Sequence, residues 1–180
     1  MFRTIFLTVL LISALAGCAA SINVTSDYQP GTNFRGYQTF GFVPEPALMV
    51  QSAEPFSPLL EGRLKAAAAE ALTRKGFRQT ENPDAADFLL SFNLGAVDQL
   101  RVNNFPNANR GGMRQSGSGE GTSEVRAFTE GTLSIDILEA NTRRPLWFGR
   151  ATRTLNASDR GDSRLVNRVV TAILEQFPPG

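Results

Sequence analysis

The sequence contains no histidine, a single cysteine and no long hydrophobic run. Without histidine, the chain lacks the commonest general base and the commonest nitrogen ligand for zinc, copper or iron. Ser-His and Cys-His nucleophile pairs are excluded for the same reason. One cysteine allows neither an intrachain disulfide nor a thiolate metal cluster. These absences leave carboxylates as the main acid–base groups, and they favour a protein that is not an enzyme and holds no cofactor.

Basic residues show no excess over acidic ones. The chain has 18 Lys and Arg against 17 Asp and Glu, a net charge of +1, and only Lys65 and Lys75 are lysines. Because nucleic-acid affinity comes mainly from clustered Lys and Arg, this balance argues against a nucleic-acid partner. The 180 residues, 42% hydrophobic and 19% charged, indicate one globular domain of ordinary size.

Residues 1–17 predict a signal peptide. Arg3 supplies one positive charge, and the apolar stretch from Ile5 to Ala14 is interrupted only by Thr8 and Ser13. This stretch is well short of the roughly 20 residues that a membrane-spanning helix needs. A secretory signal is therefore favoured over a transmembrane helix.

The segment Leu15-Ala16-Gly17-Cys18 resembles the lipobox of bacterial lipoproteins. The resemblance implies cleavage between Gly17 and Cys18, a diacylglyceryl group on the Cys18 sulfur, and acylation of the new N-terminus. The alternative is an ordinary signal peptide that happens to contain a cysteine. Several acyl chains would hold the domain on a membrane, because each buried methylene contributes about 0.8 kcal/mol.

The residue after the cysteine bears on the destination. Ala19 stands where an aspartate would signal inner-membrane retention in enteric bacteria. The resemblance therefore implies the periplasmic face of the outer membrane in a Gram-negative bacterium, with residues 18–21 as a lipidated tether. The membrane would be a partner through this anchor.

Residues 22–178 are expected to form a single periplasmic domain whose strands show a period of two. Phe88, Leu90 and Phe92 would share one face, and Ser91 and Asn93 the other, as in an antiparallel sheet covered on one side. Trp147, Gly149 and Ala151 are expected to face the helices, with the small residues leaving room for a helix backbone. The predicted strands cover residues 22–28, 37–43, 87–101, 129–139 and 146–155. A proline-rich segment, 44–58, is expected to be an extended connector.

Two helices are predicted, over residues 57–75 and from Asp162 or Ser163 to about Gln176. Ser57 is placed to cap the first, Pro58 suits its first position, and Gly76 ends it. The predicted order is β-β-α-β-β-β-α. The fold class is therefore α+β, with an antiparallel sheet of about five strands and two helices packed on one face.

The segment from Asn103 to Ser123 is long for a connection in a compact domain and predicts a flexible tip loop between two strands. Its glycines at 117, 119 and 121 do not form a phosphate-binding loop, since no Gly-Lys-Ser/Thr ending or helix follows them. Arg101, Arg110 and Arg114 would suit an anionic headgroup or polymer, but a solvated loop is favoured.

Three pairs of acidic residues are close enough in sequence to be considered for acid–base catalysis. All lie in polar turns or at helix starts, where solvated carboxylates are usual, so a catalytic role is disfavoured. The pairs are Asp84 with Asp87, Glu120 with Glu124, and Asp159 with Asp162.

Four apolar residues are expected on the sheet face opposite the helices: Leu89, Leu138, Leu146 and Phe148. If adjacent and exposed, they would form an apolar patch of the kind that marks interaction sites. Shielding by the N-terminal segment, or simple scatter, is an equally good explanation of their positions.

The mature chain also resembles the lipoproteins grouped as domain of unknown function family 4136. The resemblance lies in the lipobox, in Asp27-Tyr28, Asn33-Phe34, Tyr37-Gln38-Thr39-Phe40 and Ser57-Pro58-Leu59, and in the stretches 76–77, 86–90, 130–136, 146–151 and 177–179. It covers essentially the whole mature chain except the tip loop. The family implies a location and a fold but no mechanism.

Taken together, these features predict a lipid-anchored envelope protein whose non-enzymatic domain binds a protein partner through the outer sheet face or the tip loop. Two alternatives remain open: a carrier of a lipid or other apolar ligand between helices and sheet, and an enzyme that uses carboxylates. The oligomeric state is left open as well.

Overall fold

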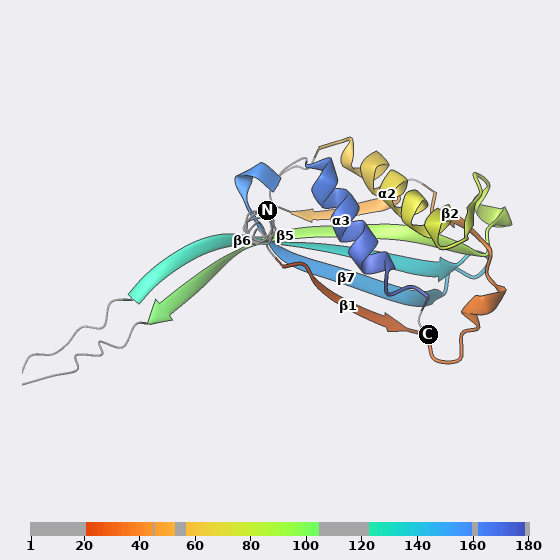
Figure 1. The fold of residues 1–180 in the computed structure, drawn as a ribbon, viewed down its shortest axis with the longest axis horizontal. Coiled ribbons are helices and arrows are strands. Elements are labelled where there is room, and N and C mark those ends of the chain that lie inside the picture. Colours follow the sequence, from red (N-terminus) through yellow and green to blue (C-terminus); the bar gives the residue numbers. More distant parts are fainter. Residues whose placement is uncertain (1–20, 45, 53–56, 105–122, 160–161, 179–180) are drawn as a thin grey trace, which may run out of the picture.

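Two helices cover one face of a seven-stranded sheet in the computed structural model, which describes residues 21–44, 46–52, 57–104, 123–159 and 162–178 (Figure 1). The helices are α2 (Leu60–Arg74) and α3 (Ser163–Leu174). The strands are β1 (Asn23–Tyr28), β2 (Thr39–Phe42), β3 (Leu48–Ser52), β4 (Arg78–Gln79), β5 (Phe88–Asn104), β6 (Ser123–Glu139) and β7 (Pro145–Leu155). Short 3-10 turns are η1 (Phe34–Gly36), η2 (Pro83–Ala85) and η3 (Ala157–Asp159).

The sheet is mixed, so the prediction of an antiparallel sheet of about five strands is correct in class but wrong in detail. The strand order is β1-β7-β6-β5-β2-β4. β3 also pairs with β5, at residues 92–96, which follow the residues of β5 that pair with β2. β2 runs parallel to β4 and β5, and β3 is also parallel to β5, while the other pairs are antiparallel. The parallel pairing arises because the chain leaves the sheet after β3 and returns through α2, as a helical crossover requires.

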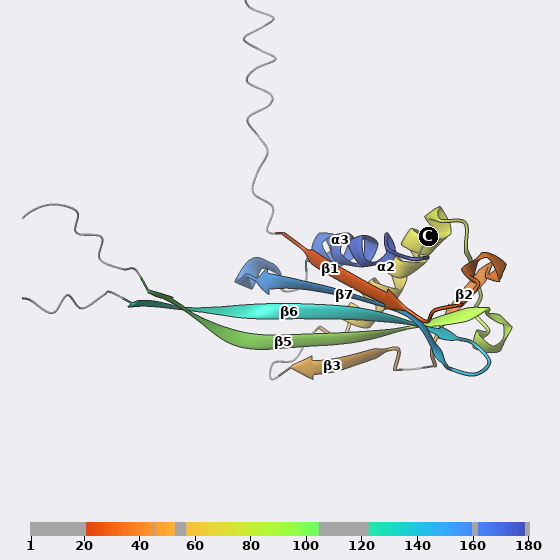
Figure 2. The same cartoon turned by 90° about the horizontal axis from the view of Figure 1, so that it is seen from below.

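The two helices pack on the sheet through the faces that the sequence predicts. The buried residues of α2 are Leu60, Leu64, Ala67, Ala68, Ala71 and Leu72. The Asp162 side chain caps α3 by accepting a hydrogen bond from the Arg164 backbone N–H at 2.9 Å. Figure 2 shows both helices on the same side of the sheet, with β1 and β3 near its opposite edges.

Small residues of β7 permit this close packing, as predicted. A Cβ added to Gly149 would lie 2.5 Å from Ile173 Cγ2 of α3 and 2.2 Å from Trp147 Cη2. Ala151 and Trp147 are both buried in the main core. Gly149 is therefore needed because the helix and the Trp147 ring both occupy the space above it.

Aromatic side chains fill the end of the domain where the helices terminate. The Phe177 ring lies after α3 and stands 5.4 Å from each of the Phe34, Phe88 and Trp147 rings and 5.8 Å from that of Phe77. We call Phe34, Phe77, Phe88, Trp147 and Phe177 the aromatic end of the core. Contacts of this kind contribute about 0.5–1.5 kcal/mol per pair beyond burial.

At the opposite end, β5 and β6 extend beyond the sheet as a two-stranded ribbon (Figure 1). β3 pairs with β5 only as far as Ala96, and β7 pairs with β6 only from Thr129 onward. The predicted tip loop lies largely outside the described residues, since β5 ends at Asn104 and β6 starts at Ser123. Gly17, Cys18 and the predicted signal peptide also lie outside them.

Candidate functional site

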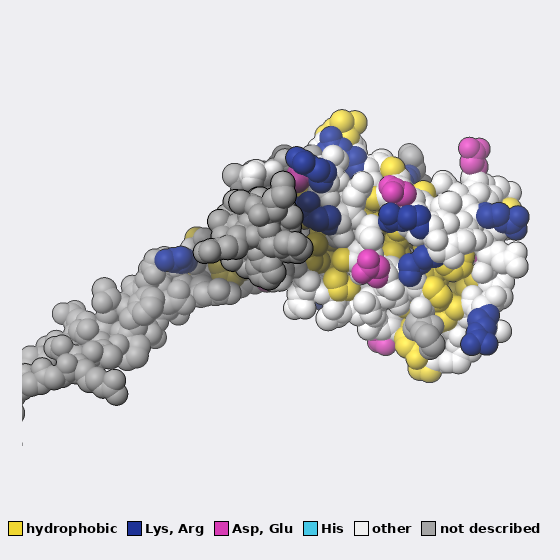
Figure 3. Space-filling model, viewed as in Figure 1, with side chains coloured by type: hydrophobic (Ala, Val, Ile, Leu, Met, Phe, Trp, Pro, Cys, Tyr) yellow, Lys and Arg dark blue, Asp and Glu magenta, His cyan; other side chains and the backbone are white. Residues whose placement is uncertain are grey.

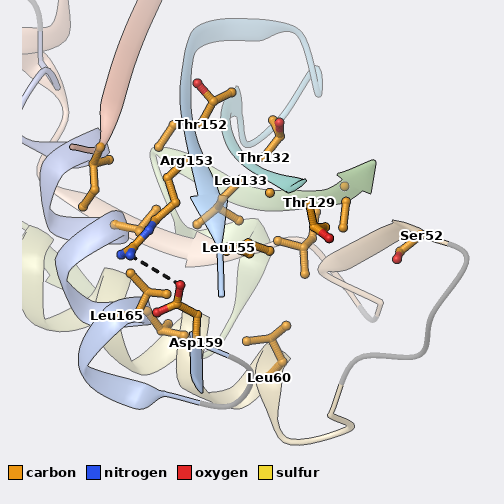
Figure 4. A pocket seen from close by; sticks show the side chains of 18 of the residues that line it. Ser52, Leu60, Thr129, Thr132, Leu133, Thr152, Arg153, Leu155, Asp159 and Leu165 are labelled. Atoms are coloured by element: carbon orange, nitrogen blue, oxygen red, sulfur yellow. Dashed lines mark ion pairs between the residues drawn. The ribbon is translucent and has the colours of Figure 1, made fainter. Parts of the chain in front are cut away.

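A pocket of about 830 Å³ lies between the N-terminal halves of the helices and the sheet. Most of its wall comes from α2, α3, β5, β6 and β7, and Ile22, just before β1, Ser52 of β3 and Asp159 of η3 also line it. Figure 4 shows Leu60 of α2 and Leu165 of α3 facing Leu133 and Leu155 of the sheet. This volume is within the range of about 300–1,000 Å³ that is typical of small-molecule sites.

The pocket exists because small residues of the sheet lie opposite helix residues that do not fill the space. Gly95, Ala96, Gly131 and Ala151 all line it. A Cβ on Gly131 would lie 2.6 Å from Leu155 Cδ1, so a larger residue there would displace this part of the wall. The larger apolar residues of the wall are aliphatic, among them Leu60, Leu64, Leu94, Leu133, Leu165 and Val169.

An ion pair crosses one side of the pocket. Arg153 of β7 and Asp159 of η3 point toward each other, with Nη2 and Oδ2 3.4 Å apart (Figure 4). Their side chains are only 10% and 12% exposed. Asp159 also accepts a hydrogen bond from the Asn156 backbone N–H at 2.9 Å. The pair therefore neutralises two charges that would otherwise be costly beside an apolar cavity.

Asp98, the other acidic residue that lines the pocket, also has a hydrogen-bond partner. Asp98 Oδ1 accepts a hydrogen bond from Thr129 Oγ1 at 2.8 Å. Among the described residues, no cluster of three Asp, Glu or Cys side chains is arranged to hold a metal ion. Within the same residues, none of the helices has the length and apolar character that crossing a membrane demands.

The predicted acidic pairs have structural partners wherever the structure describes them. Asp162 caps α3, and Asp159 pairs with Arg153. Asp87 Oδ2 accepts hydrogen bonds at 2.8 Å from Gln38 N, Thr39 N and Thr39 Oγ1. Burial acts to raise the pKa of Asp87, but these hydrogen bonds outweigh it, and the pKa lies below the ordinary value. The side chains of Glu120 and Glu124 lie outside the described residues, and exposed Asp84 is 3.9 Å from Arg143.

The predicted apolar patch is not exposed as expected, so that prediction is wrong for Leu89 and Leu146. Leu89 is 0% exposed because Ala86, Ala140 and Val43 cover it. Leu146 is 1% exposed and belongs to the main core, because the β6–β7 pairing shifts register between Ile137 and Leu138. Leu138 and Phe148 are half-buried. A register shift of this kind changes the face of a side chain, and the sequence pattern does not reveal it.

The same outer face carries a half-buried carboxylate. Asp136 of β6 accepts hydrogen bonds from Asn93 Nδ2 at 2.6 Å and Ser91 Oγ at 3.5 Å. Burial raises its pKa above the ordinary value. The Phe148 ring lies beside it in register and stacks with the Arg150 guanidinium at 5.4 Å.

Charged side chains of both signs are interspersed over the helix-covered side of the domain, with apolar ones visible between them (Figure 3). No large area of one sign is visible on this face. The arrangement on this face agrees with the balanced composition.

Comparisons with known proteins identify the family and the fold. The family described as domain of unknown function (DUF4136) matches residues 24–179. A crystal structure of a DUF4136 family protein from Bacteroides thetaiotaomicron aligns with a TM-score of 0.56 and 13% identity, covering 89% of this chain and 97% of that one.

Two further solved structures are more distant. The PelC dodecamer from Paraburkholderia phytofirmans has a TM-score of 0.46 and 14% identity, over 86% of this chain and 95% of that one. Lipoprotein GNA1162 from Neisseria meningitidis has a TM-score of 0.39 and 12% identity, over 77% and 96%. These scores are too low to indicate a shared function, and no curated protein sequence matches the chain. The match over residues 24–179 shows that the chain belongs to the DUF4136 family.

Proposed function

We propose that this protein is a lipid-anchored envelope protein whose non-enzymatic domain binds an apolar ligand between its helices and its sheet. The observation that carries the proposal is the pocket of about 830 Å³ with its aliphatic wall. The burial of Leu89 and Leu146 weakens the case for a protein partner on the outer sheet face. The apolar-ligand alternative is therefore the better supported of the hypotheses that the sequence raises.

The binding free energy expected for an apolar ligand in this pocket is sufficient for a carrier. Each methylene group that leaves water contributes about 0.8 kcal/mol, so ten of them contribute about 8 kcal/mol before costs. Association costs at least about 4 kcal/mol in lost freedom of motion. The difference corresponds to an affinity of about millimolar, and each further two methylenes improve it about tenfold. A ligand with a long apolar portion would thus bind usefully and still be released.

The lack of catalytic groups supports a binding role over an enzymatic one. The chain has no histidine, and the described carboxylates of the pocket, Asp98 and Asp159, are each held by a partner. Carboxylates engaged in this way are less available to accept or donate a proton.

Attachment to a membrane rests on the lipobox at residues 15–18. The test is the mass of the mature protein from cells: the expected product starts at Cys18 and carries acyl groups. A mature protein of unmodified mass would refute the anchored form while leaving the pocket proposal intact.

The pocket is tested by titrating the protein with N-phenyl-1-naphthylamine, whose fluorescence rises in apolar sites. We expect saturable binding that Ala96→Phe weakens, because Ala96 lines the pocket. Ala66→Phe is the matched control, since Ala66 is exposed on α2 and does not line the pocket. A linear signal without saturation would contradict the proposal.

A second candidate is a protein partner at the β5–β6 ribbon. Val97 and Leu100 are 61% and 73% exposed there, and within the described residues neither strand pairs with a third beyond Ala96 and Thr129. Unpaired strand edges with apolar side chains favour strand addition by a partner. Replacing Val97 and Leu100 by Thr should abolish crosslinked complexes in cells while leaving the melting temperature nearly unchanged; unaltered complexes would contradict this role.

A further inference from the structure

We propose that the ligand of the pocket is a linear fatty acyl chain whose polar head stays outside. This inference rests on the proposed binding function and specifies the ligand's chemical class. Three independent features support it: the aliphatic character of the apolar wall residues, the ion pair that neutralises Arg153 and Asp159, and the position of the pocket next to the start of β1.

The side chains of the wall distinguish an alkyl chain from a planar ring. The sequence has 13 Phe, two Tyr and one Trp, yet none of the described lining residues is aromatic. The aromatic residues are concentrated at the other end of the same helix–sheet interface, around Phe177. Sites for flat ligands commonly offer aromatic faces for stacking. The apolar part of the wall, which consists of Leu, Val, Ile, Ala and Gly, instead suits a flexible chain that makes only dispersion contacts.

The charges of the wall are satisfied within the protein. Arg153 pairs with Asp159, Asp98 is bound by Thr129, and Arg63 also has an interaction partner. An anionic group of a ligand inside the pocket would lose its hydration and would find Arg153 already paired with Asp159, which is costly. The charged or polar head of the ligand therefore remains outside, and Ser52 and Ser57 add hydroxyl groups to the wall.

The position of the pocket relative to the predicted anchor supplies the source of the chain. Ile22 lines the pocket, and Cys18 precedes it by four residues. Four residues span at most about 14 Å, even when fully extended. Lipid on Cys18 would therefore hold the pocket close to the bilayer surface, where acyl chains are abundant. The chain that enters belongs either to a membrane lipid or to the lipid on Cys18 itself.

The test uses the mature chain with Cys18→Ser, which carries no lipid and contains every described residue. It is titrated in parallel with cis-parinaric acid, a linear fluorescent fatty acid, and 1-aminoanthracene, a planar aromatic probe. We expect cis-parinaric acid to bind with a stoichiometry of one and palmitate to displace it. Ala96→Phe should weaken this binding about tenfold or more, the equivalent of losing about two buried methylenes. Ala66→Phe should leave it unchanged.

The outcomes separate this inference from the function on which it rests. If neither probe binds saturably, the pocket is not a ligand site and the proposed function fails. If 1-aminoanthracene binds and palmitate does not displace it, the function stands and the acyl chain is refuted. Val166→Trp, which narrows the pocket from α3, provides a second variant if Ala96→Phe does not fold.

Native mass spectrometry of the lipidated protein then distinguishes the two sources. A noncovalent lipid that adds to the mass identifies a chain from the membrane. Lipidated protein that carries no added mass, and binds palmitate only after Cys18→Ser, identifies the protein's own acyl chain. Both results support an acyl chain as the occupant.

Discussion

Removing one partner of the Arg153–Asp159 ion pair should cost the domain a large part of its stability. The two side chains are 10% and 12% exposed, so neither charge can return to full hydration in the folded state. At 3.4 Å and an effective dielectric constant of about 20, their attraction is about 5 kcal/mol before the desolvation of both ions is subtracted. Desolvation is of comparable size, so the pair adds little net stability, but its disruption leaves one buried charge unpaired.

Asp159→Ala is therefore expected to lower the free energy of unfolding by about 3 kcal/mol, because Arg153 remains beside an apolar cavity. Arg153→Met should cost less, about 2 kcal/mol, because Asp159 keeps the hydrogen bond from Asn156 N. The double variant should lose only about 1 kcal/mol, less than either single variant, because no unpaired charge is left and the main loss is the hydrogen bond from Asn156 N.

The measurement is urea unfolding followed by far-UV circular dichroism, with the four proteins of the cycle compared at constant m-value. Arg143→Met with Asp84→Ala provides the matched control, because that pair is 3.9 Å apart and its Asp84 side chain is 88% exposed. Its four proteins should agree within about 0.5 kcal/mol. If the Arg153 and Asp159 effects simply add, the two groups are not coupled, and the account of a neutralised pocket wall is wrong.

Three further predictions each concern a single residue. Gly149→Ala should lower the free energy of unfolding by about 3 kcal/mol in the same assay, since the added Cβ would lie 2.5 Å from Ile173; an unchanged midpoint would show that α3 moves away freely. Asp87→Ala should cost about 2 kcal/mol at pH 7 through three lost hydrogen bonds. The folded pKa of Asp87 is depressed, so its contribution to the free energy of unfolding is fully present above the ordinary pKa of 3.8 and is lost as the pH falls through the folded pKa. The difference in unfolding free energy between wild type and Asp87→Ala should therefore shrink as unfolding is measured at lower pH. Cys18→Ala should leave an unprocessed, unlipidated precursor on a mass spectrum, and an unchanged mature mass would refute lipidation.

Regular patterns explain why much of the fold could be predicted. β5 and β6 alternate apolar and polar residues near the helices, so one face had to be buried, and the pairing of Phe88–Leu94 with Leu133–Glu139 follows from that. The second strand of this pair is predicted to begin at residue 129, so the ribbon from Ser123 was not predicted. The buried residues of α2 recur at helical spacing in the sequence, and Asp162 is the cap that its position before an apolar helix suggests. These features could be predicted because each depends on residues that are close together in the sequence.

The parts that could not be predicted depend on distant partners. β3 lies within the segment expected to be an extended connector, and its Met49 and Val50 are 55% and 45% exposed, so it lacks the alternation of a half-buried strand. β4 has only two residues. Whether such segments join the sheet, and in which direction, is decided by the crossover through α2. The prediction that Leu146 lies on the outer face is wrong for a related reason, because a shift in the β6–β7 pairing cannot be read from the sequence of either strand alone.

The pocket likewise has no signature in the sequence, since its wall combines single residues from distant segments. The structure shows an unequal distribution of side-chain size along the helix–sheet interface. At the end where the helices terminate, Phe177 contacts four other aromatic rings and the core is filled. At the end where they begin, Ala and Gly face Leu and Val, and the same spacing between helix and sheet leaves a cavity. The aromatic end fixes how far α2 and α3 stand from the sheet, so the other end cannot collapse to remove the space. Any ligand that fills it binds only the folded state and must therefore raise the free energy of unfolding, by an amount that grows with the logarithm of the free ligand concentration divided by its dissociation constant.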